Sequence, residues 1–312
     1  MMGRQPMVSP ARGDDVAGET GRWRLWLEAM RPRTLPASMA PVAISVVIAA
    51  DDGAAHVGAA LAALTAATAI QIGANFANDY SDFRKGTDNA PKLGRRRLLP
   101  SGLVSPAAMA RAAGAAFAVA CLAGLYLTYR SGWPVVIIGV ASILAGVLYT
   151  GGPRPYGYRG LGEVFVLVFF GPVATAGGYF VQALSVDWRL VVAGLGPGLI
   201  ACAILAVNNL RDADSDAASG KRTLAVMLGK RFARMEHAAC IVAGAAGVPL
   251  ALVLAGAAGP WALLPMLTLL PALPVIRTVM VENDPDRLNA ALGATGRLLA
   301  LFAALFCVGW LL

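Results

Sequence analysis

VGAALAALTAATAIQIGANFANDYSDFRKGTD, residues 57–88, passes without a break from an apolar run into a cluster of Asn, Asp, Arg and Lys. Its first part, residues 57–80, is long enough to cross a bilayer, because a membrane helix needs about 20 mostly apolar residues. In the polar part Asn78 and Asp82 are four residues apart, so on a helix they share one face. The stretch therefore predicts a membrane span that ends in a row of oxygen ligands.

A second segment, NNLRDADSDAASGKRT (residues 208–223), repeats this pattern at the end of another apolar run. Asn208, Asp212 and Asp216 are again spaced by four, and Asn75 joins the first row seven residues before Asp82. Like charges four apart on a helix repel each other, and carboxylates near a membrane are costly to bury. A hard cation such as Mg²⁺ offsets both costs and commonly bridges carboxylates to substrate phosphates. The two rows, facing each other, predict a site for a diphosphate held through Mg²⁺.

Basic residues accompany both clusters, and their side chains are suited to hold phosphate oxygens directly. They are Arg84, Lys85, Lys92 and Arg95–Arg97 after the first row, and Lys221 and Arg222 after the second. Anchoring of the membrane topology explains Arg95–Arg97 equally well.

The composition of the whole chain is that of a membrane protein. Its 312 residues are 57% hydrophobic and 14% charged, whereas soluble proteins carry roughly 45–50% apolar and about 25% charged residues. We predict an all-α chain with residues 1–20 as a disordered cytoplasmic tail and 21–312 as one membrane domain. Nine spans are expected, at about 34–50, 57–80, 106–128, 133–150, 161–184, 189–210, 236–256, 260–281 and 293–312.

The distribution of positive charge predicts how these spans are oriented. With nine spans, every Lys and Arg except Arg130 and Arg189 falls on the side of the N-terminus. The positive-inside rule makes that side the cytoplasm, so both polar rows face the cytoplasm. Topology thus accounts for the net charge of +8, and no nucleic acid partner is expected. The four cysteines stand singly and only two histidines occur, which disfavours a zinc or iron–sulfur site.

NDYSDFRKGTD and NNLRDADSDAASGKRTLAVMLG resemble the two signature motifs of the UbiA superfamily of membrane aromatic prenyltransferases. The likeness extends from RPRTLPAS, which begins at Arg31, to the last span. With YTGGPRPYGYRGLGEVFVLVFF (residues 149–170), these stretches are most similar to the branch that prenylates 1,4-dihydroxy-2-naphthoate in menaquinone synthesis. Gly86 stands where many relatives have a third Asp, a departure that this branch shares, and it leaves open whether Asp88 contacts metal.

The resemblance implies a helical bundle around a cavity that opens to lipid, and it implies roles for individual residues. Asn78, Asp82, Asp212 and Asp216 would be the Mg²⁺–diphosphate groups, with Asp79 and Asn208 beside them. Lys221 and Arg222 would bind phosphate, and Arg31 or Arg33 would hold an anionic substrate. Tyr149 and Arg154 resemble the Tyr and basic residue that the family places near the reacting allyl carbon.

Glu163 is the only carboxylate within the predicted span 161–184. Charged residues inside a span usually face a cavity or the bundle interior, so contact with the aromatic acceptor is one interpretation. A structural ion pair with Arg159 or Arg154 is the other.

The function implied is Mg²⁺-dependent transfer of a polyprenyl group from its diphosphate to 1,4-dihydroxy-2-naphthoate, with decarboxylation to a demethylmenaquinone. The same chemistry on 4-hydroxybenzoate, homogentisate or a sugar phosphate remains an alternative. A secondary transporter is a further alternative, since the recurring Asn/Asp motif is consistent with an internal repeat. The sequence does not specify the oligomeric state.

Overall fold

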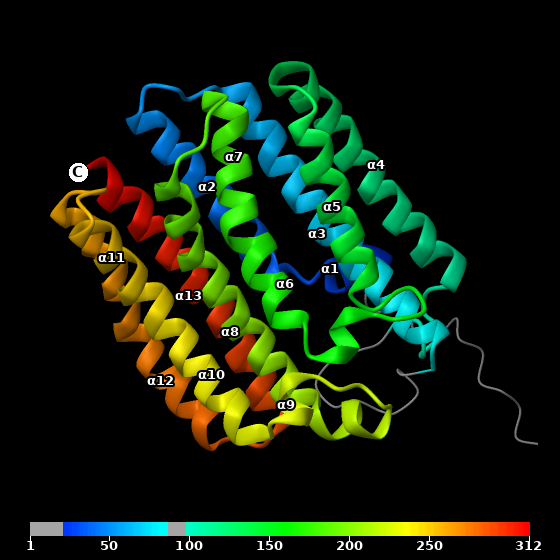
Figure 1. The fold of residues 1–312 in the computed structure, drawn as a ribbon. Coiled ribbons are helices and arrows are strands. Elements are labelled where there is room, and N and C mark those ends of the chain that lie inside the picture. The colour runs from blue at the N-terminus through cyan, green and yellow to red at the C-terminus, as the bar shows by residue number, and fades with distance from the viewer. Residues whose placement is uncertain (1–20, 87–97) are drawn as a thin grey trace, which may run out of the picture.

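The computed structural model describes residues 21–86 and 98–312, and over these ranges every regular element is helical. Predictions for the tail 1–20 and for Asp88, Lys92 and Arg95–Arg97 concern residues outside the described ranges. Figure 1 shows the helices packed side by side as an elongated bundle.

Seven helical stretches are long and apolar enough to cross a membrane. Four are continuous α-helices: α3 (Val57–Arg84), α4 (Pro106–Ser131), α8 (Trp188–Ala218) and α13 (Pro285–Leu311). Three are composite: α6 (Gly162–Val168) with η3 (Phe169–Val173) and α7 (Ala174–Ala183); α10 (Lys230–Val242) with η4 (Ala243–Gly247) and α11 (Val248–Leu254); and η5 (Pro260–Thr268) with α12 (Leu269–Val281). The chain is therefore a multi-pass membrane protein.

Two of the nine expected spans differ from a simple crossing helix. The first is a broken pair, in which α1 (Arg22–Met30) and η1 (Pro32–Thr34) meet α2 (Pro36–Asp51) at a bend of 55°. The fourth, α5 (Pro134–Leu148), has 15 residues, fewer than the roughly 20 that a perpendicular crossing needs. Two short helices, η2 (Tyr156–Arg159) and α9 (Leu224–Met227), complete the described structure.

Local sequence explains where several helices begin. The side chains of Ser105, Asp187 and Asp284 each accept a hydrogen bond from a backbone N–H of the following first turn. Such caps satisfy donors that have no partner within the helix. The polar motifs do not end their helices, because α3 continues to Arg84 and α8 to Ala218. Both helices therefore extend beyond the predicted spans 57–80 and 189–210.

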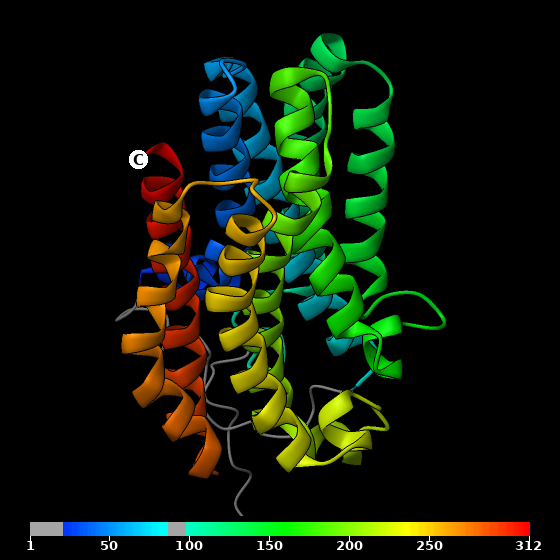
Figure 2. The same cartoon turned by 60° about the vertical axis from the view of Figure 1, so that its left-hand side comes forward.

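α8 forms the centre of the bundle, and α4 lies at its periphery. Of an apolar stretch of 18 residues in each helix, 72% is buried in α8 and 17% in α4. α8 packs against α10, α13 and η3, and the two ribbon views agree on this arrangement (Figure 1, Figure 2). Large apolar side chains such as Leu122, Leu254 and Val281 are 67% to 78% exposed, as expected for a surface that faces lipid.

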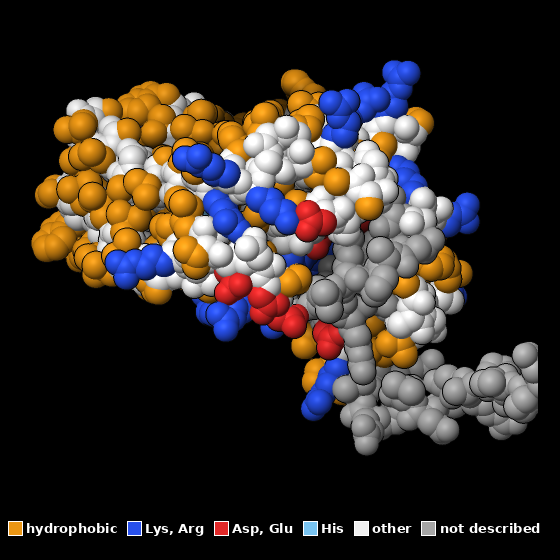
Figure 3. All heavy atoms as spheres, turned by 90° about the horizontal axis from the view of Figure 1, so that it is seen from below, with side chains coloured by type: hydrophobic (Ala, Val, Ile, Leu, Met, Phe, Trp, Pro, Cys, Tyr) orange, Lys and Arg blue, Asp and Glu red, His pale blue; other side chains and the backbone are white. Residues whose placement is uncertain are grey.

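Charged side chains gather at one end of the bundle. Figure 3 looks at the end that is lowest in Figure 1, and it shows Lys, Arg, Asp and Glu there beside an apolar flank. α3 and α8 both end on this side (Figure 1). The two polar motifs therefore share one end of the molecule.

Glycines allow α8 to approach the segment formed by α6 and η3 at backbone distance. A Cβ added to Gly194 would lie 2.8 Å from backbone atoms of Gly171 and Pro172, and one on Gly198 would lie 2.7 Å from the carbonyl oxygen of Leu167. Small residues at helix crossings permit such contacts in membranes.

We expect Gly194→Ala to destabilise the bundle by about 1–3 kcal/mol, because the backbones must separate to admit the methyl group. Gly114→Ala in α4 is the matched control, since its added Cβ meets nothing within 4 Å and Ala is the better helix former. Thermal unfolding in detergent, followed by tryptophan fluorescence, measures both. An unchanged midpoint for Gly194→Ala would show that this crossing is not tightly packed.

Candidate active site

A polar cavity of about 90 Å³ lies where α3 and α8 end. Its walls carry the carboxylates and amides of both motifs: Asn78, Asp79, Asp82, Asn208, Asn209, Asp212 and Asp216. Cations also line it, namely Arg31, Arg211 and Lys221, together with the phenols of Tyr149 and Tyr158.

Helical periodicity explains which motif residues reach the cavity. Asp212 and Asp216 are one turn apart on α8. Both side chains are buried, and both line the polar cavity. Asp214, between them, has a side chain 87% exposed and pairs with Lys230 at 2.7 Å. The spacing of four residues in the sequence therefore becomes a row on one face, as expected from the helix period.

Lys221 connects the two rows. Its Nζ lies 3.1 Å from Oδ2 of Asp82 on α3 and 4.0 Å from Oδ1 of Asp216 on α8. Gly220, at φ 75°, turns the chain back after α8, and the Lys221 N–H donates to the Asp216 carbonyl at 2.9 Å. Glycine adopts this left-handed conformation at little cost. The two rows meet across one buried ammonium, so the expectation that they face each other holds.

Contacts from neighbouring loops hold the first row in place. Arg31 donates to Asp79, and the Thr150 hydroxyl donates to Oδ1 of Asn78 at 2.9 Å. The amide of Asn75 donates to the carbonyl of Met30 at 3.0 Å. These bonds tie α3 to the bend before α2 and to the loop after α5.

Arg211 and Tyr158 also line this cavity, although the sequence motifs did not single them out. Arg211 donates to both oxygens of Asp212 at 2.9 and 2.8 Å and to Oδ1 of Asn208 at 2.8 Å. The Tyr158 hydroxyl donates to Oδ1 of Asp82 at 2.6 Å. Arg211 lies within the second motif, so its position next to Asp212 was a usable signal. Nothing in the local sequence distinguishes Tyr158 from its neighbour Tyr156.

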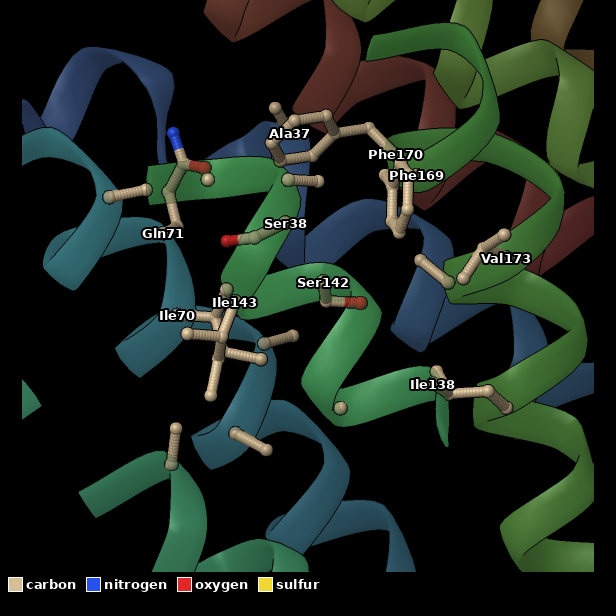
Figure 4. A pocket seen from close by; sticks show the side chains of 18 of the residues that line it. Ala37, Ser38, Ile70, Gln71, Ile138, Ser142, Ile143, Phe169, Phe170 and Val173 are labelled. Atoms are coloured by element: carbon tan, nitrogen blue, oxygen red, sulfur yellow. The ribbon is translucent and has the colours of Figure 1, made fainter. Parts of the chain in front are cut away.

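A larger apolar cavity of about 490 Å³ adjoins the polar one. Arg31, Asn78, Tyr149 and Asn208 line both cavities and so form the junction between them. Figure 4 shows apolar side chains of the larger cavity, including Ile70, Ile143, Phe169 and Phe170, with Gln71 and Ser142 among them. Asn75 also lines this cavity.

Five of the predicted substrate-binding or catalytic residues line neither cavity: Arg33, Lys85, Arg154, Glu163 and Arg222. Arg154 and Arg222 are exposed, and Arg33 lies against Gly293 and Gly296 of α13. Lys85 donates to the backbone carbonyls of Thr150 and Gly152, at 2.6 and 3.0 Å. Burial lowers the pKa of the Lys85 ammonium, although the negative charge of Asp82 acts in the opposite direction.

Glu163 is buried at the start of α6 and does not itself line either cavity. Its Oε1 accepts a hydrogen bond from Nδ2 of Asn209 at 2.8 Å, and Asn209 lines the polar cavity. The structure thus pairs Glu163 with Asn209 and with neither Arg154 nor Arg159. The geometry makes Glu163 a support for Asn209.

We therefore expect Glu163→Gln to keep activity within about threefold of the parent, because the amide oxygen still accepts from Asn209 and neutral hydrogen bonds contribute only about 1 kcal/mol. Glu163→Ala removes the acceptor and is expected to cost more. Initial rates with saturating substrates measure both. Complete loss of activity in Glu163→Gln would instead support direct chemistry by this carboxylate.

The donor set of the polar cavity fits Mg²⁺. Mg²⁺ prefers oxygen ligands and is usually held by one or two carboxylates, waters and substrate phosphates. Within residues 21–86 and 98–312, no three His, Cys, Asp or Glu side chains converge to enclose a metal on their own. One carboxylate from each row nevertheless approaches a single cation, the Lys221 ammonium. Such a donor set leaves coordination positions of a Mg²⁺ ion for waters and substrate phosphates.

The helical membrane fold and this site define an enzyme of a known family: the UbiA prenyltransferase family matches residues 38–305, and the chain belongs to it. It is similar to the 1,4-dihydroxy-2-naphthoate octaprenyltransferase of Escherichia coli (strain K12), with 37% identity over 93% of this chain and 96% of that protein. The octaprenyltransferase of the same name from Mycobacterium tuberculosis is 45% identical over 68% of this chain and 72% of its own length.

Solved structures share the fold at lower identity. A UbiA homolog from Aeropyrum pernix K1 has a TM-score of 0.67 at 18% identity, over 88% of this chain and 96% of that chain. A UbiA homolog from Archaeoglobus fulgidus bound to DMAPP and Mg²⁺ has a TM-score of 0.64 at 14% identity, over 92% and 99%.

Proposed function

We propose that this enzyme transfers a polyprenyl group from its diphosphate to 1,4-dihydroxy-2-naphthoate, with loss of the acceptor carboxylate as CO₂, and so makes a demethylmenaquinol, the hydroquinone form of a demethylmenaquinone. The names of the bacterial relatives support this acceptor. Their similarity to this chain extends over up to 96% of the relative's length. A homologous structure bound to DMAPP and Mg²⁺ supports a prenyl diphosphate donor.

One observation carries the proposal: Asn/Asp rows from α3 and α8 line a single polar cavity that adjoins a much larger apolar one. A prenyl diphosphate has this same division, with a charged head and a long hydrocarbon tail. The head suits the oxygen ligands and cations, and the tail suits the apolar cavity.

The residues of the polar cavity would hold and stabilise the leaving group. Asn78, Asp82, Asp212 and Asp216 would hold Mg²⁺, which when bound neutralises the charge that grows on the departing diphosphate. Lys221, whose ammonium already lies between the two rows, would donate to a phosphate oxygen. The C–O bond breaks with its electron pair leaving on the diphosphate, and the allyl carbon then bonds to the ring carbon that loses CO₂.

The junction between the cavities would place the acceptor. Arg31 and Tyr149 line both cavities, so both side chains can reach a ring at the allyl carbon. Arg31 would pair with the acceptor carboxylate while its charge remains balanced by Asp79.

We further propose that the bundle crosses the membrane nine times, with the polar cavity on the cytoplasmic side. The broken pair ending in α2 and the short helix α5 would supply the two crossings beyond the seven long ones. The Lys and Arg asymmetry supports this orientation. Residues 1–20 would form a cytoplasmic tail, and residues 21–312 one domain.

Purified enzyme in nanodiscs, supplied with a labelled prenyl diphosphate and one acceptor at a time, tests the function. We expect a decarboxylated prenyl naphthoquinol, identified by mass, from dihydroxynaphthoate in the presence of Mg²⁺ and none in excess EDTA. Product from 4-hydroxybenzoate, homogentisate or a sugar phosphate, with none from dihydroxynaphthoate, would overturn the acceptor assignment.

A further inference from the structure

We propose that Tyr158 is a positioning residue that aligns Asp82 and Lys221 for binding of the Mg²⁺–diphosphate group. This inference rests on the proposed function and adds a residue that neither of the two sequence motifs contains. Tyr158 lies on η2, between the end of α5 and the start of α6, and it lines the polar cavity.

The two oxygens of Asp82 are held by different groups. Oδ1 accepts from the Tyr158 hydroxyl at 2.6 Å, and Oδ2 accepts from Lys221 Nζ at 3.1 Å. A carboxylate bonded at both oxygens has a fixed plane, whereas one bonded at a single oxygen is free to rotate about that bond. Tyr158 thus contributes to fixing the direction in which the remaining lone pairs of Asp82 point.

The ring of Tyr158 adds a second constraint. Lys221 Nζ lies 4.7 Å from its centroid, and Lys85 Nζ lies 5.1 Å from it. Ammonium groups at this distance are attracted by the negative face of an aromatic ring, and more strongly where water is excluded. The Tyr158 ring therefore contacts one lysine from each motif region, while its hydroxyl bonds Asp82.

The backbone of η2 is tied to the second motif as well. The Arg222 N–H donates to the Tyr158 carbonyl at 3.0 Å, immediately after Lys221. Gly157 fits against Tyr149, since an added Cβ would lie 2.7 Å from the Tyr149 carbonyl oxygen. The turn that carries Tyr158 is thus seated between a cavity-junction residue and the loop after α8, as a rigid support for positioning requires.

Tyr158→Phe tests the hydroxyl, with Tyr179→Phe as the matched control. Tyr179 donates to Asp52 at 2.7 Å, an equivalent phenol–carboxylate bond, near Arg189 and away from both motifs. The measurement is Mg²⁺-dependent binding of an unreactive geranyl thiodiphosphate to enzyme in nanodiscs, by calorimetry. We expect Tyr158→Phe to raise the half-saturating Mg²⁺ concentration about tenfold, the usual effect of losing a hydrogen bond to a charged group, and Tyr179→Phe to leave it unchanged.

Tyr158→Leu also removes the ring and should raise that concentration further, with an effect on prenyl diphosphate KM and little on acceptor KM. Mg²⁺ dependence that is unchanged in Tyr158→Phe would overturn the proposal, as would equal shifts in Tyr158→Phe and Tyr179→Phe. The binding assay contains no acceptor. A shift specific to Tyr158→Phe together with no naphthoate product would therefore uphold Tyr158 and overturn the proposed function alone.

Discussion

Asp82→Asn is expected to reduce prenyl transfer by at least about a thousandfold while the bundle stays folded. Asp82 lines the polar cavity and bonds both Tyr158 and Lys221. The amide keeps the size of the side chain but removes the negative charge that a divalent cation requires. Loss of a single electrostatic contact in an active site costs about 10²–10³ in rate, and loss of a metal ligand should cost at least as much.

Asp212→Asn and Asp216→Asn should behave in the same way, and Asp214→Asn provides the matched control. Asp214 lies on the same helix, but its side chain is 87% exposed and pairs with Lys230. Its loss should change the rate by less than about twofold, since exposed ion pairs contribute 0–1 kcal/mol. Product formation at saturating Mg²⁺, with size-exclusion elution as the check on folding, measures all four variants. Near-normal turnover in purified Asp82→Asn would contradict the metal assignment.

Lys221→Met is expected to lower kcat/KM for the prenyl diphosphate by about 10²–10³-fold. Methionine has a similar length, but it removes the ammonium that lies between Asp82 and Asp216. The two carboxylates then repel each other without compensation, and the diphosphate loses a charged donor. Acceptor KM should change little, because Lys221 does not line the apolar cavity.

The matched control for this prediction is Lys230→Met, which removes the lysine of the exposed pair with Asp214. Steady-state kinetics with each substrate varied in turn distinguish the two variants. Equal losses in both variants would mean that overall charge, and not the position of Lys221, determines binding.

The sequence predicted the helical membrane fold and the convergence of the two motifs because both follow from local periodicity. Spacing by four placed Asp212 and Asp216 on one face of α8 and turned Asp214 away. The lengths of the apolar runs located the long spans. The break at η1 and the shortness of α5 were not evident, since apolar composition alone does not show where a helix bends.

The contacts between segments distant in sequence could not be predicted. Glu163 faces Asn209 and not a neighbouring Arg because the crossing of α6 and α8 brings them together. Tyr158 reaches Asp82 across 76 positions of sequence. Such pairings depend on how the helices pack, and a single sequence carries no direct signal of packing. The same reason explains Arg154 and Arg222, which a motif places near substrate but which are exposed here.

Binding of Mn²⁺ in place of Mg²⁺, followed by electron paramagnetic resonance, tests most directly whether both motifs share one metal-bound diphosphate. With geranyl thiodiphosphate present, the parent enzyme should bind Mn²⁺, and Asp82→Asn and Asp212→Asn should each lose most of that signal. Asp214→Asn should keep it. If Asp212→Asn binds Mn²⁺ and the diphosphate as the parent does, the second row does not contribute to the site, and the shared-site account is wrong.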